Sequence, residues 1–166
     1  MNSRRVLINL AMVLAAVAIG FGLYYRYRVP PEIAFGKLPL LTADGKPASL
    51  NDYAGKVVVL NFWASWCADC LREMPSMADA QSQLDADKVA FVCITDESDE
   101  KLQRFLRTHN YPFVFLRTTQ THKSNGIHAL PCTYVIDRKG QIAYSVMGST
   151  AWNAPGQINH IRTLAR

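Results

Sequence analysis

The chain has 166 residues, of which 49% are hydrophobic and 19% charged, so it can hold one ordinary domain plus a short extra segment and is too apolar for a disordered protein. Its net charge of +5 comes largely from the N-terminus, because from residue 29 onward 14 Lys and Arg face 13 Asp and Glu. The basic balance therefore gives no support for nucleic-acid binding.

Residues 6–25 carry no charge, and at helical rise this segment spans the ~30 Å hydrocarbon core of a bilayer. Arginines flank it on both sides, and tyrosines lie at its C-terminal end, where an interfacial aromatic belt forms. The alternative is a cleaved signal peptide with a small-residue site at residues 16–18, but the apolar run continues past that site. We therefore predict a retained membrane anchor, with Arg4 and Arg5 favouring a cytoplasmic N-terminus and an exported remainder.

The whole chain is predicted to have three parts. Residues 1–28 form the anchor with its basic flanks, residues 29–34 form a proline-containing linker, and residues 35–166 form one domain. Hydrophobic periodicity and turn residues predict its elements in chain order. They are a hairpin from Lys37 to beyond the turn at Asp44-Gly45, strand 57–62, helix 67–84, strand 89–95, helix 97–109, strand 113–116, strands 133–137 and 141–147, and a last helix capped by Asn153 and ending near Leu164. This order predicts an α/β fold with a mixed sheet and helices on both faces.

Cys67 and Cys70 lie where the apolar strand 57–62 gives way to a helix. A helix N-terminus stabilises a thiolate through its unpaired N–H groups and its dipole, so we expect Cys67 to be the reactive thiol. Cys70 lies on the same helical face, close enough to form a disulfide and to resolve an intermediate at Cys67. The alternative, a zinc site, requires two more ligands, and no second CxxC or suitably spaced Cys/His pair is present; we predict no metal site.

Glu73 follows Cys70 by three residues, again on the same helical face. Position 77 is Met, so the usual basic partner four residues on is missing, while Asp69 carries the same charge as Glu73. We therefore favour a proton donor and acceptor for Cys70, with a pKa raised by partial burial, over a surface charge.

Pro131, preceded by Leu130, stands at the start of a predicted strand, a position that tolerates proline. Two interpretations stay open: a trans proline closing a loop, or a cis proline beside the dithiol that leaves the Leu130 backbone free to pair with an extended substrate. We interpret Cys93 as a small core residue and Cys132 as an inert packing residue, although Cys132 is placed to approach the dithiol. The four histidines are expected on the surface or in loops.

Over about residues 35–164 the chain resembles the TlpA/ResA-like (DsbE-type) branch of the thioredoxin-like superfamily. The resemblance rests on Asn61-Phe62-Trp63-Ala64-Ser65-Trp66-Cys67-x-x-Cys70-x-x-Glu73-x-Pro75, followed by Leu130-Pro131 and by YVIDRKG at 134–140. It implies a thioredoxin-like fold, Cys67 as the attacking thiol and Cys70 as the resolving thiol. It further implies Glu73 as the active-site acid and a cis Pro131, with a substrate-binding surface at Trp66, Leu130 and Pro131. The sequence departs from the branch in its Ala-Asp between the cysteines and in Cys132, where Thr is frequent.

Members of this branch are anchored in the inner membrane, face the periplasm or the equivalent outer side, and usually reduce disulfides of exported proteins, including apocytochromes c. The resemblance therefore implies a single-pass protein-disulfide reductase without a cofactor, re-reduced by a membrane electron donor. Two alternatives stay open: a thiol peroxidase, for which no activating Thr/Arg set is visible, and a Cu(I)-handling assembly factor, for which a partner His is missing. The negative charges of Asp69 and Glu73 favour a low reduction potential, because they oppose a thiolate.

Overall fold

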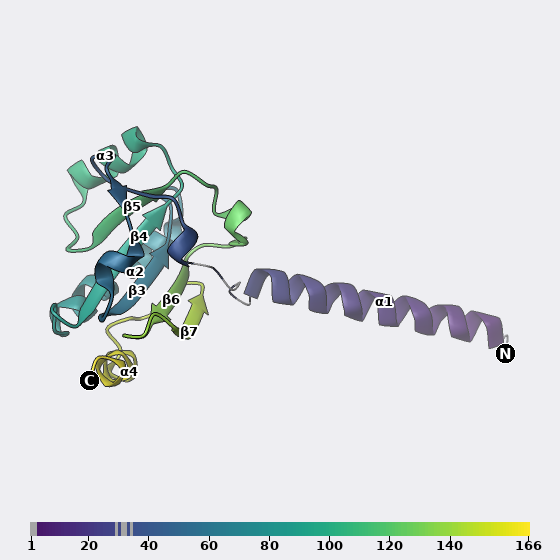
Figure 1. Ribbon diagram of the computed structural model, residues 1–166. Coiled ribbons are helices and arrows are strands. Elements are labelled where there is room, and N and C mark those ends of the chain that lie inside the picture. Colours follow the sequence, from purple (N-terminus) through teal and green to yellow (C-terminus); the bar gives the residue numbers. More distant parts are fainter. Residues whose placement is uncertain (1–2, 29, 31–32, 34) are drawn as a thin grey trace.

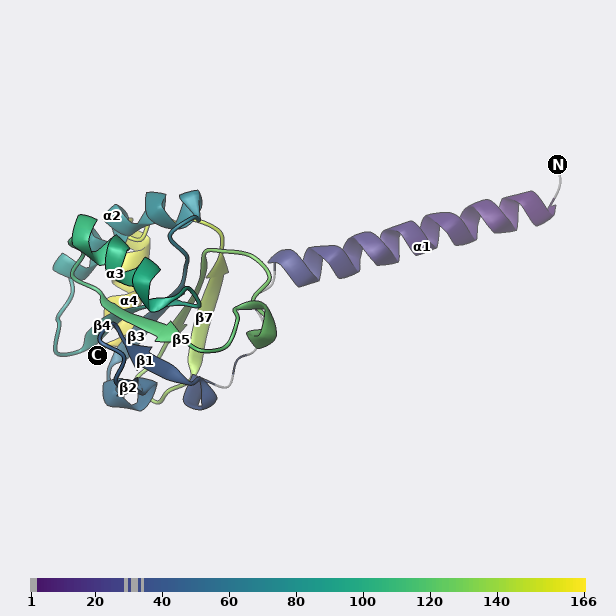
Figure 2. The same cartoon turned by 90° about the horizontal axis from the view of Figure 1, so that it is seen from above.

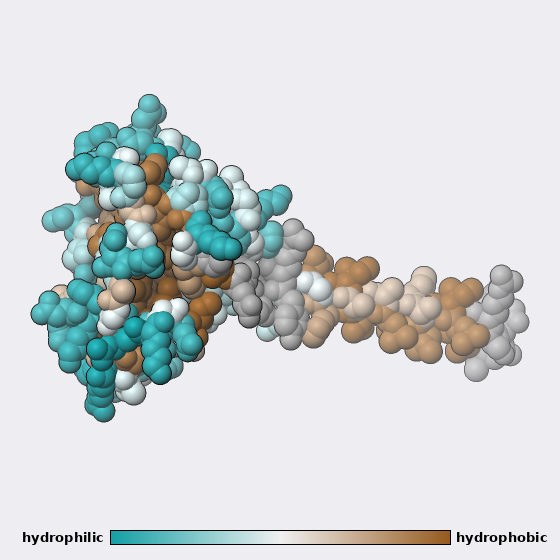
Figure 3. Space-filling view, viewed as in Figure 1, coloured by the Kyte–Doolittle hydropathy of each residue, from teal (hydrophilic) through white to brown (hydrophobic). Residues whose placement is uncertain are grey.

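The computed structural model describes residues 3–28, 30, 33 and 35–166 (Figure 1). Its first element, α1 (Ser3–Arg28), contains the 19-residue stretch Val6–Tyr24, which is long and apolar enough to cross a membrane and is not buried against the rest of the chain. Figure 3 shows the part of this helix between its grey ends as a mostly apolar surface. The predicted linker 29–34 falls mostly outside the described residues.

A mixed sheet forms the centre of the domain, in the strand order β2-β1-β5-β4-β3-β6-β7 within the described residues. β3, β4 and β5 are parallel, whereas β6 is antiparallel to β3, β7 to β6, and β1 to both β5 and β2. The bounds are β1 Leu40–Thr42, β2 Pro47–Ala48, β3 Val57–Phe62, β4 Val89–Thr95, β5 Val114–Thr118, β6 Cys132–Ile136 and β7 Ile142–Met147. The mixed sheet and its flanking α-helices agree with the predicted α/β fold.

The central strand β3 is buried along its whole length, as its apolar run predicts. Asn61, the one polar residue in the run, pairs in register with Cys93 on β4 and with Thr133 on β6. Because paired residues in neighbouring strands point to the same face, these three side chains form a row on one side of the sheet. That row lies beneath the helix that follows β3.

Three α-helices cover one face of the sheet: α2 (Ala68–Ser82), α3 (Asp99–Thr108) and α4 (Pro155–Leu164) (Figure 2). The other face is covered by loop residues and by the 3-10 helices η1 (Phe35–Lys37) and η2 (Leu50–Tyr53), with Ile127 just beyond η3 (Lys123–Asn125). The sequence predicts helices on both faces, whereas α2, α3 and α4 all lie on one face and the other face carries only the short 3-10 helices and loops. Two successive right-handed crossovers, β3-α2-β4 and β4-α3-β5, step in the same direction across the sheet, and this puts α2 and α3 on one side.

The last helix begins as predicted with Pro155 in its first turn, but Asn153 does not cap it. Ala154 occupies the N-cap position without a side-chain hydrogen bond. The amide of Asn153 instead donates to the carboxylate of Asp79 on α2 over 2.8 Å. This bond ties the start of α4 to α2, which carries the cysteine pair.

Candidate active site

Cys67 is the N-cap residue of α2, so the helix begins one residue later than predicted. Its sulfur accepts a hydrogen bond from the backbone N–H of Cys70 (3.2 Å), the type of contact that stabilises a thiolate. The two cysteines form a disulfide, with their Cα atoms 5.3 Å apart. Cys67 is 7% exposed and Cys70 is fully buried, so the outer sulfur is the one that a substrate reaches first.

Trp66 directly precedes Cys67 in the chain, and Leu130 packs against the core cluster that contains both cysteines. Trp66 is 71% exposed, which is unusual for a large aromatic residue and offers an apolar ring at the surface next to Cys67 in the sequence. The Leu130–Pro131 peptide bond is cis, as the resemblance implied, and the Pro131 carbonyl accepts from the backbone N–H of Gly148 (2.9 Å). A cavity of about 390 Å³ lies between Trp66 and the segment 121–130. Its wall includes Trp66, the residue before Cys67, and Leu130, the residue before the cis proline.

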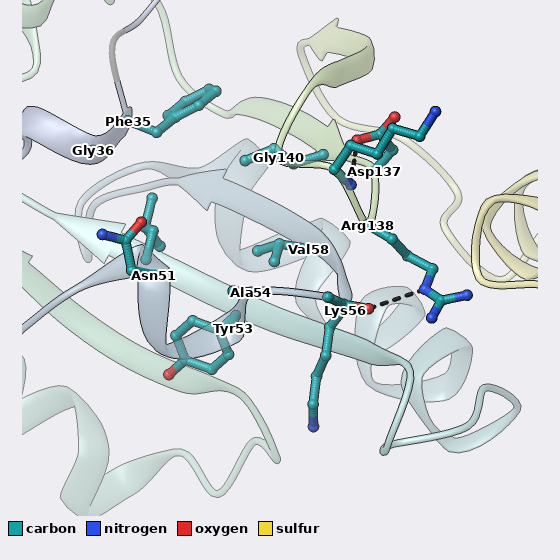
Figure 4. Close-up of a pocket in the computed structure, with 14 residues that line it drawn as sticks. Phe35, Gly36, Asn51, Tyr53, Ala54, Lys56, Val58, Asp137, Arg138 and Gly140 are labelled. Carbon is teal, nitrogen blue, oxygen red and sulfur yellow. Dashed lines mark hydrogen bonds between the residues drawn. The ribbon is translucent and has the colours of Figure 1, made fainter.

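A second cavity, of about 250 Å³, lies at the other end of β3 and is remote from the cysteine pair (Figure 4). Its wall includes Phe35, Val58 and Arg138, and the Arg138 guanidinium donates to the Gly55 carbonyl over 3.0 Å. Arg138 also donates to the carbonyl of Arg166. These two bonds connect the turn after β6 to the segment before β3 and to the C-terminal residue, so the Arg138 side chain holds three chain segments together.

Glu73 is only 2% exposed, deeper than the partial burial that the sequence predicts. Its Oε1 accepts from the Asn61 amide (2.8 Å), and its Oε2 accepts from the backbone N–H of Thr150 (3.0 Å) and the indole N–H of Trp152 (3.3 Å). Burial raises the pKa of Glu73 from its ordinary 4.5 to about 7, while the three hydrogen bonds act in the opposite direction. A carboxyl that titrates near neutral pH is suited to exchange protons with a thiol.

The row below Glu73 explains why a polar residue occurs in the central strand. Asn61 donates to Glu73 and also to the Thr133 hydroxyl, each over 2.8 Å. In the sequence, Asn61 stands out only as the first residue of the motif that carries the resemblance, and the sequence gives no sign of Thr150 or Trp152. The indole of Trp152 is 79 positions away from Glu73, so no local spacing links the two residues.

Asp69 lies between the cysteines but points outward, with its side chain 55% exposed, and forms an ion pair with Arg72. From the sequence, Asp69 and Glu73 are predicted to act on the thiolate as two negative charges. Exposure and the pairing with Arg72 screen the first charge, and the raised pKa leaves the second only partly ionised near pH 7. The electrostatic argument for a low potential is therefore weaker than the sequence suggested.

The two remaining cysteines lie on opposite faces of the sheet. Cys132 packs with Phe62 and Tyr134 on the face away from α2, where burial raises the pKa of its thiol to about 11. Cys93 is buried on the α2 side, in the cluster that contains Cys67 and Cys70. The predicted core role of Cys93 is confirmed, and the packing of Cys132 on the far face contradicts an approach of its thiol to the dithiol.

His122 lies in the loop before η3, in agreement with the prediction that the four histidines are on the surface or in loops. It is buried, its Nε2 contacts the Trp63 carbonyl (3.1 Å), and its backbone N–H donates to Asp96 (2.8 Å). Burial lowers the pKa of the imidazole, so His122 is neutral at physiological pH. It links the segment after β5 to the loop that leads to Cys67.

A family model for the AhpC/TSA family matches residues 34–145. The chain belongs to this family. Its relatives include a thioredoxin-like protein, YneN, from Bacillus subtilis strain 168, 35% identical over 108 residues that cover 62% of this chain and 63% of that relative. A thiol-disulfide oxidoreductase, ResA, from Bacillus thuringiensis subsp. konkukian is 29% identical over 157 residues, covering 89% of this chain and 91% of that one. These matches confirm the resemblance to the TlpA/ResA-like branch.

Solved structures share the fold of this AhpC/TSA family member. A putative thiol:disulfide interchange protein DsbE from Chlorobium tepidum has a TM-score of 0.68 at 24% identity, covering 81% of this chain and 100% of that one. The exposed lipoprotein thioredoxin Etrx1 of Streptococcus pneumoniae strain TIGR4 has a TM-score of 0.61 at 25% identity, covering 73% of this chain and 96% of that one. Both confirm the thioredoxin-like fold.

Proposed function

We propose that this chain is a membrane-anchored thiol–disulfide oxidoreductase that reduces disulfides of exported proteins through Cys67 and Cys70. The observation that carries the proposal is the Cys67–Cys70 disulfide at the start of α2, with Cys67 slightly exposed, Cys70 fully buried and the preceding Trp66 lining a cavity. The ResA relatives, which are named thiol-disulfide oxidoreductases and align over most of the chain, support the same activity.

In the proposed reaction, the Cys67 thiolate attacks one sulfur of the substrate disulfide, and the other substrate sulfur leaves as a thiolate. Cys70 then loses its proton, attacks the Cys67 sulfur and releases the second substrate thiolate. The substrate disulfide gains two electrons, and the Cys67/Cys70 dithiol loses two as its own disulfide forms. The N–H groups at the start of α2 favour the Cys67 thiolate that begins the sequence.

Glu73 is proposed to accept the Cys70 proton. Cys70, Glu73 and Met74 all lie on the buried side of α2, so the acid and the inner thiol share one environment. With a pKa of about 7, the carboxyl is partly ionised near neutral pH and changes its protonation state readily. The proton then passes to a departing substrate thiolate or to water.

Trp66, Leu130 and Pro131 are proposed to bind the substrate polypeptide on either side of Cys67. Trp66 offers an exposed apolar ring, and Leu130 lies at the edge of the neighbouring cavity. An extended segment of substrate would pair with the backbone before Pro131, which precedes the first strand residue, Cys132. The proposed substrates include apocytochromes c, whose haem-attachment cysteines are paired in a short motif.

The N-terminal helix fits a single-pass anchor by length and composition. We propose that residues 1–28 stay in the mature protein as the anchor, residues 29–34 link it to the domain, and residues 35–166 face the periplasm or the equivalent outer side of the inner membrane. A membrane protein that carries electrons across the bilayer would restore the dithiol after each turnover. No cofactor is needed for this exchange.

Trapping tests the proposal directly. The full chain with Cys70→Ala, expressed in its membrane, should accumulate mixed disulfides with exported proteins at Cys67, which mass spectrometry after acid quenching would identify. The matched variant Cys67→Ala should accumulate none. Adducts on Cys70 in the Cys67→Ala variant would reverse the assigned roles, and adducts confined to cytoplasmic proteins would contradict the topology. Peroxide consumption and Cu(I) titration of the reduced protein test the two alternatives.

A further inference from the structure

The segment between β7 and α4 is bonded to both parts of the proposed active site. Its first residue, Gly148, donates its backbone N–H to the Pro131 carbonyl over 2.9 Å. Two positions on, Thr150 donates its backbone N–H to Glu73, and the Trp152 indole donates to the same carboxyl oxygen. The short segment 148–152 therefore joins the cis proline to the buried acid.

Ser76 fastens this segment to α2 by separate bonds. Its hydroxyl accepts from the backbone N–H of Trp152 (3.2 Å) and donates to the Glu73 carbonyl (2.8 Å) one turn back. The backbone of Trp152 is thus anchored independently of its side chain. A change confined to the indole N–H would leave this backbone bond in place.

The indole N–H of Trp152 is not explained by packing alone. Trp152 and Trp63 are both fully buried in the cluster beneath the helices. The indole nitrogen of Trp63 has no hydrogen-bond partner among the described residues, so this core accommodates a tryptophan that only fills space. Trp152 also fills space, but its N–H is aimed at a carboxyl group. That difference points to a task in the chemistry of Glu73.

We propose that Trp152 is a positioning residue for Glu73, fixing the carboxyl oxygen Oε2 while Asn61 fixes Oε1, so that the acid is held in the orientation and ionisation that exchange with Cys70 requires. The proposal rests on the proposed role of Glu73. It adds that the segment 148–152 senses the charge of the acid, because the Thr150 and Trp152 donors bind the carboxylate more strongly than the neutral carboxyl.

The expected pH effect has a definite sign. Hydrogen bonds from N–H donors favour the ionised carboxyl, so removing the indole donor raises the pKa of Glu73 above about 7. The other titratable groups that act on Glu73 are Asp69 on the same helix and Cys93 on β4. Burial raises the pKa of the Cys93 thiol well above its ordinary value, so Cys93 stays neutral. Cys67 and Cys70 do not titrate while they are joined as a disulfide.

The direct test is nuclear magnetic resonance of the oxidised full chain, labelled with ¹⁵N in detergent micelles, where the three tryptophans give three indole N–H signals. The Trp152 signal should shift with pH, with a midpoint near the Glu73 pKa of about 7, and this titration should vanish in Glu73→Gln. The Trp63 signal serves as an internal control and should not follow that midpoint. A Trp152 signal that does not titrate, or that titrates unchanged in Glu73→Gln, overturns the proposal.

A kinetic test uses Trp152→Phe, which keeps the aromatic bulk, with Trp63→Phe as the matched control. A mixed disulfide of Cys67 with glutathione is formed, and its resolution by Cys70 is followed as glutathione release between pH 5.5 and 9. Trp152→Phe should move the midpoint of the pH profile upward by about one pH unit, making release below the midpoint about tenfold slower. Trp63→Phe should keep the midpoint of the unmodified chain.

An unchanged midpoint in Trp152→Phe overturns the proposal, and so does an equal shift in both variants. Neither test depends on the physiological direction of exchange. A chain that fails to trap exported proteins but shows the Trp152 titration would contradict the proposed function alone. The reverse result, trapping with a silent Trp152, would contradict the positioning role alone.

Discussion

Replacing Glu73 with glutamine should make the stability of the domain less dependent on pH, and the sign follows from the raised pKa of the carboxyl. Below pH 4.5 Glu73 holds its proton in both the folded and the unfolded state. Between pH 4.5 and about 7 the unfolded state loses that proton while the folded state keeps it, so the free energy of unfolding falls as the pH rises. Above about 7 both states are ionised, and the loss is complete.

The size of this effect follows from the same pKa. A rise from 4.5 to about 7 corresponds to roughly 3 kcal/mol of free energy, at about 1.4 kcal/mol per pH unit. The amide introduced by Glu73→Gln would resemble the protonated acid and would not titrate. The difference in unfolding free energy between Glu73→Gln and the unmodified chain should therefore grow from pH 4.5 to pH 7 and then level off.

Chemical denaturation of both oxidised proteins at pH 5, 6, 7 and 8 measures this difference. Comparing the two proteins at each pH cancels the contributions of the other titrating groups, including the buried His122. Glu73→Gln should be the more stable protein at pH 8, although it should resolve mixed disulfides more slowly. Parallel stability curves, with a constant difference over this range, would refute the view that Glu73 titrates near neutral pH inside the fold.

Three further changes test other parts of the account. Cys132→Ser should leave turnover nearly unchanged, because the thiol faces away from the dithiol. It should lower the unfolding free energy by about 1–3 kcal/mol, because a hydroxyl is buried in place of the thiol. A large loss of turnover at unchanged stability would contradict the position of Cys132 on the far face. Asp69→Asn should raise the reduction potential by less than about 20 mV, because Asp69 is exposed and paired with Arg72, and an interaction between exposed charges is worth at most ~1 kcal/mol. Glutathione equilibration measures the potential, and a larger rise would show that the negative charge of Asp69 reaches the thiolate unscreened. His122→Gln should reduce the loss of thermal stability below pH 6.5. Burial lowers the pKa of the His122 imidazole, so the unfolded state takes up a proton more readily than the folded state as the pH falls, and the fold loses stability. If the decrease of Tm below pH 6.5 is the same in the variant, this prediction is wrong.

Local patterns in the sequence predict the buried central strand, the start of the helix at the cysteine pair and the burial of Glu73. The nearly continuous apolar run of β3 indicates a strand buried on both faces, and the cysteine pair after it indicates a helix N-terminus. Both inferences depend only on residues close together in the chain. The burial of Glu73 was also indicated locally, because no basic residue stands one turn away to pair with it.

The remaining features depend on contacts that sequence spacing does not reveal. The shared face of α2 and α3 follows from the order of strands in the sheet, which a single sequence leaves open. The placement of Cys132 follows from its register opposite Phe62, since a shift of one residue would have turned its thiol toward the dithiol. The donors Thr150 and Trp152 reach Glu73 only after the whole sheet has formed.

The reduction potential of the Cys67/Cys70 pair tests the central claim, that the protein acts as a reductant of protein disulfides. Equilibrating the full chain with glutathione buffers of graded composition, followed by acid quenching and thiol alkylation, gives the fraction of dithiol at each potential. A reductase should have a value near the roughly −270 mV of thioredoxin rather than the approximately −120 mV of the oxidant DsbA. A value near about −150 mV would make the protein an oxidase or an isomerase and would contradict the proposed function.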